Sequence, residues 1–451
     1  MNLREYLPYY RRNLMVAIPV MITQAGQYAV QLADNIMVGH LGTAELAGVA
    51  FANSILVIGN VFAIGFSQGV TPYIGQYYGQ GKFAQASKYF RHSLFMNVLL
   101  SLFLCALMFV PYMLMNNMGQ DPDILQYSKS YYVIGVISMI PFIIFFAIRQ
   151  FSEGIGITKY AMYITLGCNL LNILLNWLLI YGKLGFPQMG VQGAAIATLI
   201  SRIIMVIWFV ILLVKKYPYR HYLKFFNNLR LESKVVRSIL KTSAPLSIQN
   251  LIEIVAFSLS AIMVGWIGKY TLAAHQIAIS MSSMSFMIAI GIGAAATIRV
   301  SHQYGERNYI GTKMAGVASV HMSIAFMGSF GLLFILLRRF IPMIFTTDPV
   351  VIEIASELLF MVALLQVFDA LQLSCLASLR ALKDVNMPLV FSAISYFLIC
   401  LPAGYLLGFV LDMGAIGVWL GLTLGLLLVG VLFYIRFIRL ADRIILQNGL
   451  R

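Results

Sequence analysis

The heptapeptide "IMVGHLG" at residues 36–42 returns almost unchanged as "IMVGWIG" at residues 262–268, an offset of 226 residues. At the same offset, "AIGFSQGVTPYIGQYYG" (63–79) aligns with "AIGIGAAATIRVSHQYG" (289–305) without a gap. Self-similarity at one fixed offset over long segments is the signature of a duplicated unit. The sequence therefore predicts two copies of one bundle.

The composition indicates what kind of bundle this is. Hydrophobic residues make up 60% of the chain and charged residues 10%, and the mean hydropathy is +0.85. Soluble domains are roughly a quarter charged, so the chain is interpreted as a membrane protein. The alternation of short strands that marks an outer-membrane barrel is absent from the sequence.

Apolar runs long enough to cross a bilayer recur along the whole chain. We predict spans at 13–38, 50–72, 93–114, 131–150, 161–182, 190–214, 242–266, 275–297, 315–337, 354–378, 388–410 and 414–437. The expected fold is an all-α membrane protein whose twelve transmembrane helices form two six-helix lobes. Because six is even, both halves enter the membrane in the same sense, and a pseudo-two-fold axis along the membrane normal relates them. We expect an N-terminal lobe at 1–214, a basic linker at 215–241 and a C-terminal lobe at 242–451.

The net charge of +15 is distributed unevenly. With both termini cytoplasmic, the inner segments carry 25 of the 31 Lys and Arg residues, the outer loops carry five, and Arg202 falls inside the sixth span. This is the positive-inside distribution, so the basic excess indicates orientation in the plasma membrane rather than nucleic-acid binding. The basic, aromatic linker suits a helix lying on the inner leaflet.

Three carboxylates lie within the apolar spans: Asp34, Glu253 and Asp369. Asp369 stands in "LLFMVALLQVFDALQLSCLASL", residues 358–379, and Glu253 is equally isolated near the centre of its span. None of the three is duplicated, because their repeat counterparts are Ser260, Gln27 and Phe145. The predicted scaffold is symmetric and its charge is not.

A carboxylate in the middle of a membrane costs at least ~2.5–3.5 kcal/mol unless a proton or a bound cation neutralises it. Glu253 and Asp369 both belong to the C-terminal half, and their proximity would suit a site that alternately holds and releases H⁺ or Na⁺. Amide side chains share their helical faces and can complete a shell of oxygen atoms: Gln249, Gln366 and Gln372. The alternative interpretation is a structural hydrogen bond between helices.

A second polar cluster lies in the N-terminal half. Asn172 and Asn176 are spaced i,i+4 and share one helical face. They either support Asp34 in a functional site or join helices through amide hydrogen bonds. Arg202 also needs a partner within its span, and Asp34 is one possibility.

Several segments, in order and spacing, resemble the multidrug and toxic compound extrusion (MATE) family, and within it the NorM-like branch. They include "DNIMVGHLGTAELAGVA", "NILLNWLLIYG", "QNLIEIVAF" and "VFDALQLSCLASLRALKDVNMP". The resemblance covers almost the whole chain. It implies a secondary active exporter of cationic amphipathic drugs or dyes, driven by inward Na⁺ or H⁺. A bacterial inner membrane, a functional monomer and alternating access without any other cofactor are also implied.

The resemblance further implies roles for single residues. The family's cation site, which would hold Na⁺ if the coupling is to sodium, falls on Glu253 and Asp369. The acid of the N-terminal lobe falls on Asp34, a third candidate for the coupling ion, with Asn172 and Asn176 as its companions. Arg202 lies outside the family's pattern and is counted, with the asparagines, among the supporting residues of the substrate cavity. Gln249, Gln366 and Gln372 remain supporting candidates from their spacing alone.

Other classes of function fit the sequence less well. A polysaccharide or lipid-precursor flippase of related fold would need several basic side chains in its cavity to handle pyrophosphate. A membrane enzyme would need a histidine–acid pair or a nucleophile cluster, and the six histidines are scattered. A P-loop is also absent, so ATP is not the expected energy source.

Overall fold

The computed structural model describes residues 3–217, 219–226 and 231–449, and within these ranges the chain is helical and has no strand. The longer helices are α1 (Leu7–Gly39), α2 (Thr43–Gln68), α3 (Thr71–Gly79), α4 (Phe83–Leu107), α6 (Pro122–Gly154), α7 (Lys159–Tyr181), α8 (Gly190–Lys215), α10 (Ser233–Ile267), α11 (Lys269–Gly305), α12 (Tyr309–Leu337), α14 (Pro349–Ala381), α15 (Asn386–Ala393) and α17 (Gly414–Gln447). The shorter elements are η1 (Leu3–Tyr6), α5 (Phe109–Leu114), η2 (Met115–Asn117), α9 (Tyr219–Leu223), η3 (Lys224–Phe226), α13 (Ile341–Phe345), η4 (Ile394–Cys400), α16 (Leu401–Tyr405) and η5 (Leu406–Val410).

The expected all-α membrane class is confirmed. Over the described residues, eleven helical segments are long and apolar enough to cross a membrane. Each of the eleven segments corresponds to one of the predicted spans from the second to the twelfth. Most of the segments begin earlier or end later than the predicted span. The first predicted span corresponds to α1, which is 33 residues long. It is not among the eleven, and amide and acid side chains interrupt its apolar character between residues 24 and 35.

The chain divides into two compact units, and two long helices contribute to both of them. Unit 1 comprises Met1–Ile22 and Ile248–Arg451, and unit 2 comprises Thr23–Ser247. The division cuts α1 a few residues after Pro19 and α10 a few residues after Pro245, the prolines inside these two helices. Each unit therefore contains the first part of a helix whose second part belongs to the other unit.

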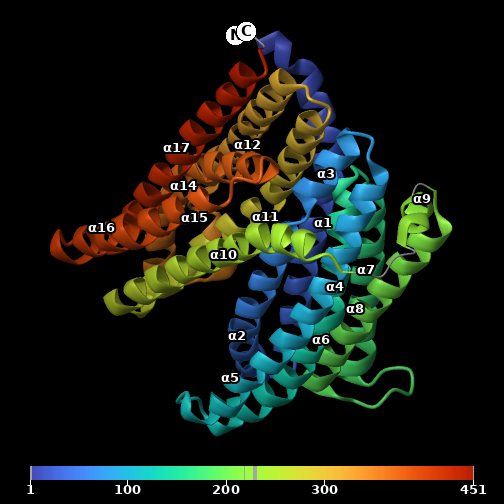
Figure 1. Cartoon of the computed structure of the whole chain (residues 1–451). Helices are drawn as coiled ribbons and strands as arrows, with labels where there is room; N and C mark the ends of the chain where they lie inside the picture. The colour runs from blue at the N-terminus through green and yellow to red at the C-terminus, as the bar shows by residue number, and fades with distance from the viewer. Residues whose placement is uncertain (1–2, 218, 227–230, 450–451) are drawn as a thin grey trace. The chain divides into compact units, whose positions relative to one another are not determined.

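One helix is central in each unit. In unit 2, α6 packs against α2, α4 and α8, and in unit 1, α14 packs against α11, α12 and α17 (Figure 1). Both helices begin with the same two residues, Asp121–Pro122 and Asp348–Pro349. The aspartate accepts a backbone hydrogen bond within the first turn, and proline occupies the first helical position. These are favoured N-terminal residues because they satisfy or remove unpaired N–H groups.

The linker after α8 is attached to unit 2 by specific contacts. Residues 233–241 of the predicted linker already belong to α10, and between α8 and α10 the described helical part is limited to α9 and η3. Tyr219 and Tyr222 are buried. Ser152 of α6 lies 2.5 Å from the Tyr219 hydroxyl, and Lys88 of α4 pairs with Glu232 at 2.5 Å. The hydrogen bond from Lys88 lowers the pKa of Glu232. Two of the linker's aromatic side chains thus pack on protein, and no long surface helix forms in its described part.

The helical segment before α17 is irregular. Two π-helical stretches, η4 and η5, flank α16, and this segment packs against α17 through glycines. A Cβ atom on Gly421 would lie 2.3 Å from the Gly404 amide nitrogen, and one on Gly425 would lie 2.5 Å from the Cys400 Cβ. Only residues without side chains permit this approach of two backbones.

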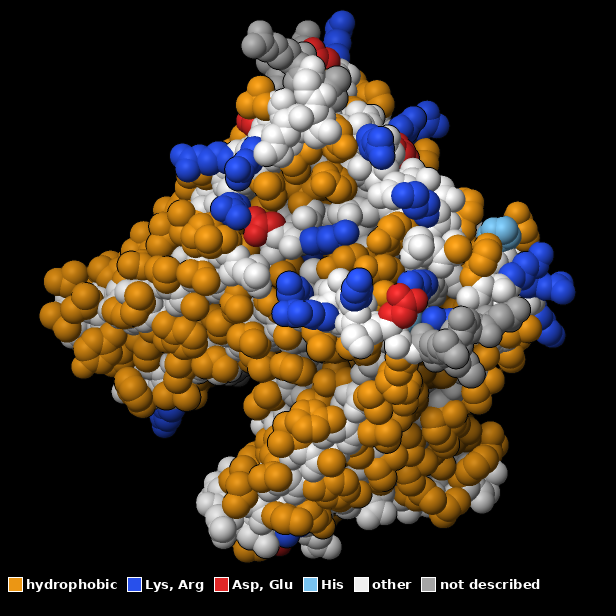
Figure 2. Space-filling model, in the orientation of Figure 1, with side chains coloured by type: hydrophobic (Ala, Val, Ile, Leu, Met, Phe, Trp, Pro, Cys, Tyr) orange, Lys and Arg blue, Asp and Glu red, His pale blue; other side chains and the backbone are white. Residues whose placement is uncertain are grey.

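The surface is strongly apolar. On the visible face, hydrophobic side chains cover most of each unit, and Lys and Arg side chains gather in the upper and right-hand parts of the view (Figure 2). Many of the exposed hydrophobic residues are Leu, Ile, Phe and Val on long helices. A surface of this kind is suited to contact with lipid.

Candidate coupling-ion and substrate sites

A chain of hydrogen bonds surrounds Glu253 in unit 1. The Gln372 side-chain amide on α14 donates to Glu253 Oε1 on α10 at 3.4 Å. The Tyr396 hydroxyl on η4 donates to Gln372 Oε1 at 3.1 Å and also lies within interaction range of the Glu253 carboxyl. Three segments of the chain therefore converge on this one carboxylate.

Asp369 belongs to the same cluster. Its side chain is buried, with 5% of its surface exposed, and it interacts electrostatically with Glu253. Neither carboxylate has a basic group within 4.0 Å among the described residues. Arg380, three turns further along α14, attracts Glu253 only over a longer range. Two acids thus lie together with mostly uncharged neighbours.

The other two predicted glutamines are adjacent to this cluster, and each is held by a serine. Gln249 donates to Ser392 on α15 at 3.1 Å, and Gln366 donates to Ser285 on α11. The Oε1 atoms of both glutamines are buried and receive no hydrogen bond from any described residue. Buried polar atoms without a partner are uncommon in proteins, which makes these two oxygens available for a ligand.

The donor set fits a hard monovalent cation or a proton. Carboxylate and amide oxygens are the ligands that hard cations prefer. Groups of three or more His, Cys, Asp and Glu side chains suited to a transition metal are absent from the described residues. A proton on either carboxyl would neutralise the same charge. The residues in unit 1 therefore suit Na⁺ or H⁺ as transported ion.

In unit 2 one predicted companion of Asp34, Asn176, contacts it directly, and the other, Asn172, is linked to it through Asn176. Asn176 donates a hydrogen bond to Asp34 Oδ1 and a second one, of 3.3 Å, to Asn172 Oδ1. Asn172 in turn donates to Thr198 on α8 at 3.4 Å. Both asparagines are buried, whereas Asp34 is partly exposed. This second acid has only neutral donors in direct contact and no second carboxylate beside it.

Arg202 does not pair with Asp34. Its guanidinium donates to the Ser138 hydroxyl at 2.7 Å and lies over the Phe142 ring at 4.5 Å. No carboxylate lies within 4.0 Å of it among the described residues. Arg202 and Asp34 therefore form no direct ion pair and attract each other only over a longer range. A hydroxyl and an aromatic face on α6 are the direct partners of the guanidinium.

Two features escaped the sequence interpretation. Arg149, at the end of the fourth predicted span, lies inside α6 and pairs with Glu153 at 2.6 Å, with both side chains at most 5% exposed. The i,i+4 spacing in "RQFSEG" was the signal for this pair. Tyr396 carried no signal, because an isolated tyrosine in an apolar run does not reveal a π-helical turn.

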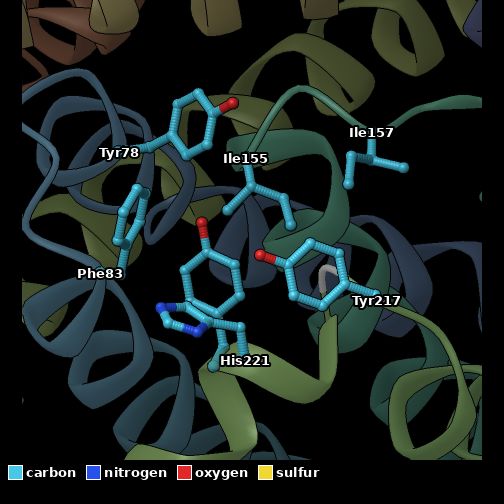
Figure 3. Close-up of a pocket in the computed structure, with 7 residues that line it drawn as sticks. Tyr78, Phe83, Ile155, Ile157, Tyr217 and His221 are labelled. Carbon is cyan, nitrogen blue, oxygen red and sulfur yellow. The ribbon is translucent and has the colours of Figure 1, made fainter.

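A further hollow lies at the linker in unit 2, and none of its lining residues belongs to the Asp34 cluster. It encloses about 300 Å³, and Figure 3 shows aromatic side chains from the linker, α3 and α4 directed into it. The lining residues are Tyr78, Phe83, Ile155, Ile157, Tyr217, His221 and Tyr222. None of these is an acid, so the pocket has no group that could neutralise a cation by charge.

Comparison with known families gives two matches along the chain. The MatE family model matches residues 19–178 and again residues 245–406. The two matches begin 226 residues apart, which is the offset of the internal repeat. Together they cover more than half of the chain.

Relatives and solved structures point in the same direction. The chain is 30% identical over 439 residues to the multidrug resistance protein NorM of Photobacterium profundum, covering 96% of each chain. It is 32% identical over 420 residues to that of Vibrio vulnificus, covering 92% of this chain and 91% of the other. An outward-facing multidrug resistance MATE family transporter superposes with a TM-score of 0.88 at 19% identity, covering 97% and 96%. The eukaryotic MATE transporter AtDTX14 gives 0.86 at 18% identity, covering 97% and 99%. The chain therefore belongs to the MatE family of multidrug and toxic compound extrusion transporters.

Proposed function

We propose that this protein is a secondary active exporter in which inward movement of Na⁺ or H⁺ through the Glu253–Asp369 cluster drives efflux of cationic amphipathic compounds by alternating access. The curated relatives are named as multidrug resistance proteins, which supports the substrate class. The coupling ion is the substrate that moves inward, and the protein needs no other cofactor.

One observation carries the proposal. Two carboxylates interact within membrane-spanning helices, and the direct partners of Glu253 are the Gln372 amide and the Tyr396 phenol rather than basic side chains. Two acids in such an environment cannot both stay charged at low cost. A proton or cation removes this energetic cost while it is bound and restores it when it leaves. A permanent basic partner would instead keep the carboxylates neutralised, and the cluster would then have only a structural role.

The available energy is sufficient for export. An inside-negative potential contributes about 2.3 kcal/mol per inward charge per 100 mV, and about 1.4 kcal/mol corresponds to a tenfold gradient. One inward cation can thus support more than tenfold accumulation of a neutral compound outside. A singly charged drug costs the same amount to move outward, so its accumulation needs a second inward cation or an inward ion concentration gradient. Coupling requires that ion and drug bind the two conformations with different affinities.

We assign Asp34 to the substrate pathway. Its carboxylate accepts a hydrogen bond from Asn176 and, through it, is linked to Asn172, whereas Arg202 attracts it only over a longer range. In its ionised form it would attract a cationic drug. We further propose a monomer in a bacterial inner membrane with both termini cytoplasmic. The basic charge distribution and the bacterial relatives support this location.

The test is dye efflux from liposomes under separately imposed Na⁺ and pH gradients. We expect wild-type protein to move a fluorescent cationic dye in response to one or both gradients. Glu253→Gln and Asp369→Asn should each reduce gradient-driven efflux at least about tenfold. Each substitution replaces one carboxylate with a neutral amide, so ion binding is no longer required to neutralise that position and the ion gradient loses its coupling to efflux.

Glu357→Gln is the matched control, since Glu357 lies on the same helix as Asp369 and is exposed. We expect it to leave efflux unchanged. Gradient-driven efflux that survives both cluster substitutions would remove the coupling role.

A lipid-precursor flippase is less consistent with the basic residues. Four arginines inside the described helices already have counterparts. Arg149 pairs with Glu153, and Arg202 contacts Ser138 and Phe142. Arg380 is attracted to Glu253 and Arg299 to Glu306. A pyrophosphate group would need several uncommitted basic donors in one cavity.

A further inference from the structure

Tyr396 is a fully buried polar group beside the two acids, and neither its position nor its role follows from the chemistry of a carboxylate pair. Its side chain is fully buried at 0% exposure, and its hydroxyl donates to Gln372 Oε1 at 3.1 Å. A buried tyrosine hydroxyl normally has a partner. Here that partner is the amide which also contacts Glu253.

The backbone places Tyr396 opposite Glu253 with a regular spacing. Gln249 and Glu253 are four residues apart on α10, and Ser392 and Tyr396 are four residues apart on the facing segment. Gln249 binds Ser392 at 3.1 Å, and Glu253 lies within interaction range of Tyr396. The two segments therefore meet in two successive polar pairs, one helical turn apart.

The π-helical stretch η4 and its glycine contacts with α17 fix the position of Tyr396 on the side of the segment that faces α17. Tyr396 lies in η4, and the residues that follow it pack tightly on α17 through Gly421 and Gly425. π-helical turns cluster at functional sites because they redirect side chains within a helix. The phenol is thus held between a backbone contact with α17 and a polar contact with α14.

The direction of the hydrogen bonds determines what this arrangement does. Tyr396 donates to the only carbonyl oxygen of the Gln372 side chain, and the N–H end of the same amide points to Glu253. An amide N–H group cannot ligate a cation, and it cannot accept the proton of a neutral carboxyl. In this arrangement, Tyr396 and an ion at Glu253 compete for Gln372 Oε1.

On the basis of the proposed coupling role, we infer that Tyr396 is a positioning residue that weakens binding of the coupling ion. It withholds Gln372 Oε1 from the ion, so that the ion can leave after it has been carried inward. An ion that uses this oxygen must turn the amide and break two hydrogen bonds. Without the phenol, it would have to break only one.

The test is Tyr396→Phe, which removes the hydroxyl and keeps the ring. Initial rates of dye efflux are measured in liposomes over a range of external cation concentrations. We expect the half-saturating concentration to fall about tenfold, the value of one hydrogen bond that no longer has to be broken. The maximal rate should also fall, because release becomes slower.

The control is Tyr405→Phe, nine residues further along the same segment. Tyr405 is 49% exposed and stacks on Phe409, so both kinetic parameters should match wild type. A half-saturating concentration that rises or stays unchanged in Tyr396→Phe overturns the inference. A purely structural role would lower the rate without tightening ion binding.

A second variant covers the case in which Tyr396→Phe does not fold, as judged by its elution as a single species in detergent. Gln372→Met removes the oxygen for which the phenol and the ion compete, and ion binding should become weaker. Unchanged ion affinity in Gln372→Met would equally overturn the inference. Failure of the proposed function itself is recognised separately, because wild-type efflux would then respond to neither gradient.

Discussion

At the residue scale, the repeat makes the environment of Asp369 directly comparable with that of its counterpart. Phe145 occupies the corresponding position on α6 and is fully buried in an aromatic and aliphatic core. Asp369 is almost as buried on α14, but it has Glu253 as an electrostatic neighbour. The same scaffold position therefore holds a packing residue in one half and an ionisable one in the other. Burying a carboxylate where a phenyl ring is tolerated costs free energy, and this cost is the argument for a functional role.

The Arg149–Glu153 pair is the clearest stability test at this scale. Glu153→Gln leaves the buried Arg149 guanidinium without its counter-charge, and breaking one side of a buried ion pair costs about 3–5 kcal/mol. We expect a clear drop in the thermal unfolding midpoint of the detergent-solubilised protein.

The comparison is Asp442→Asn, which breaks the Lys313–Asp442 pair, whose carboxylate side chain is 46% exposed. Exposed pairs contribute about 0–1 kcal/mol, so the midpoint should hardly move. Equal midpoints for the two variants would show that the Arg149–Glu153 pair is not effectively desolvated.

At the element scale, glycine spacing decides how the irregular segment before α17 is held. Gly417, Gly421 and Gly425 recur every four residues on α17, and each would place a Cβ atom within 2.6 Å of the facing segment. This spacing keeps the contact on one helical face. The contact supports the π-helical turn that carries Tyr396, so packing on one side of the segment is linked to the ion cluster on the other.

Gly421→Ala tests this contact. Its Cβ atom would lie 2.3 Å from the Gly404 amide nitrogen and 2.4 Å from the Gly404 Cα, so backbone must move. Overpacking of this kind costs about 1–3 kcal/mol. We expect a lower unfolding midpoint together with altered ion dependence of efflux.

Gly328→Ala on α12 serves as the control, because nothing lies within 4 Å of its added Cβ atom. It should cause no loss of stability. If Gly421→Ala behaves in the same way, the two backbones do not approach as closely as described.

At the scale of the whole molecule, the two acid clusters belong to separate units. Glu253 and Asp369 lie in unit 1, and Asp34 lies in unit 2 with its asparagines. Among the described residues, Asp34 has no second carboxylate recorded as its electrostatic neighbour, whereas Asp369 has Glu253. The duplicated scaffold thus carries an ion-type cluster in one copy and a single acid with neutral donors in the other, consistent with a division of labour between ion and substrate.

Asp34→Asn tests this division. It removes the negative charge of unit 2 and leaves the unit 1 cluster intact. We expect maximal dye efflux to fall, since the attraction for a cationic dye is lost, while the external ion concentration that gives half-maximal efflux stays as in wild type. If the half-maximal external ion concentration of Asp34→Asn shifted as it does in Glu253→Gln, Asp34 would instead be a binding residue for the coupling ion.

Much of this protein could be predicted from its sequence because the determining forces are local or additive. Apolar length defines the membrane helices, and the 226-residue offset defines the duplication. The isolation of Glu253 and Asp369 in apolar runs identifies them as candidates before any contact is known. Their approach to each other also follows from their common half, since helices of one bundle bury their polar faces together.

Only the tertiary structure decided which neighbours these acids have. Arg202 pairs with Ser138 and Phe142 rather than with Asp34, and Gln366 contacts Ser285 while Gln372 contacts Glu253. Which partner a side chain contacts depends on the rotation of each helix about its axis and on the π-helical turn that contains Tyr396. Either can change the direction of a side chain by a fraction of a helical turn. Hydrogen bonds depend steeply on distance and angle, so a sequence pattern that defines a helical face cannot determine the partner.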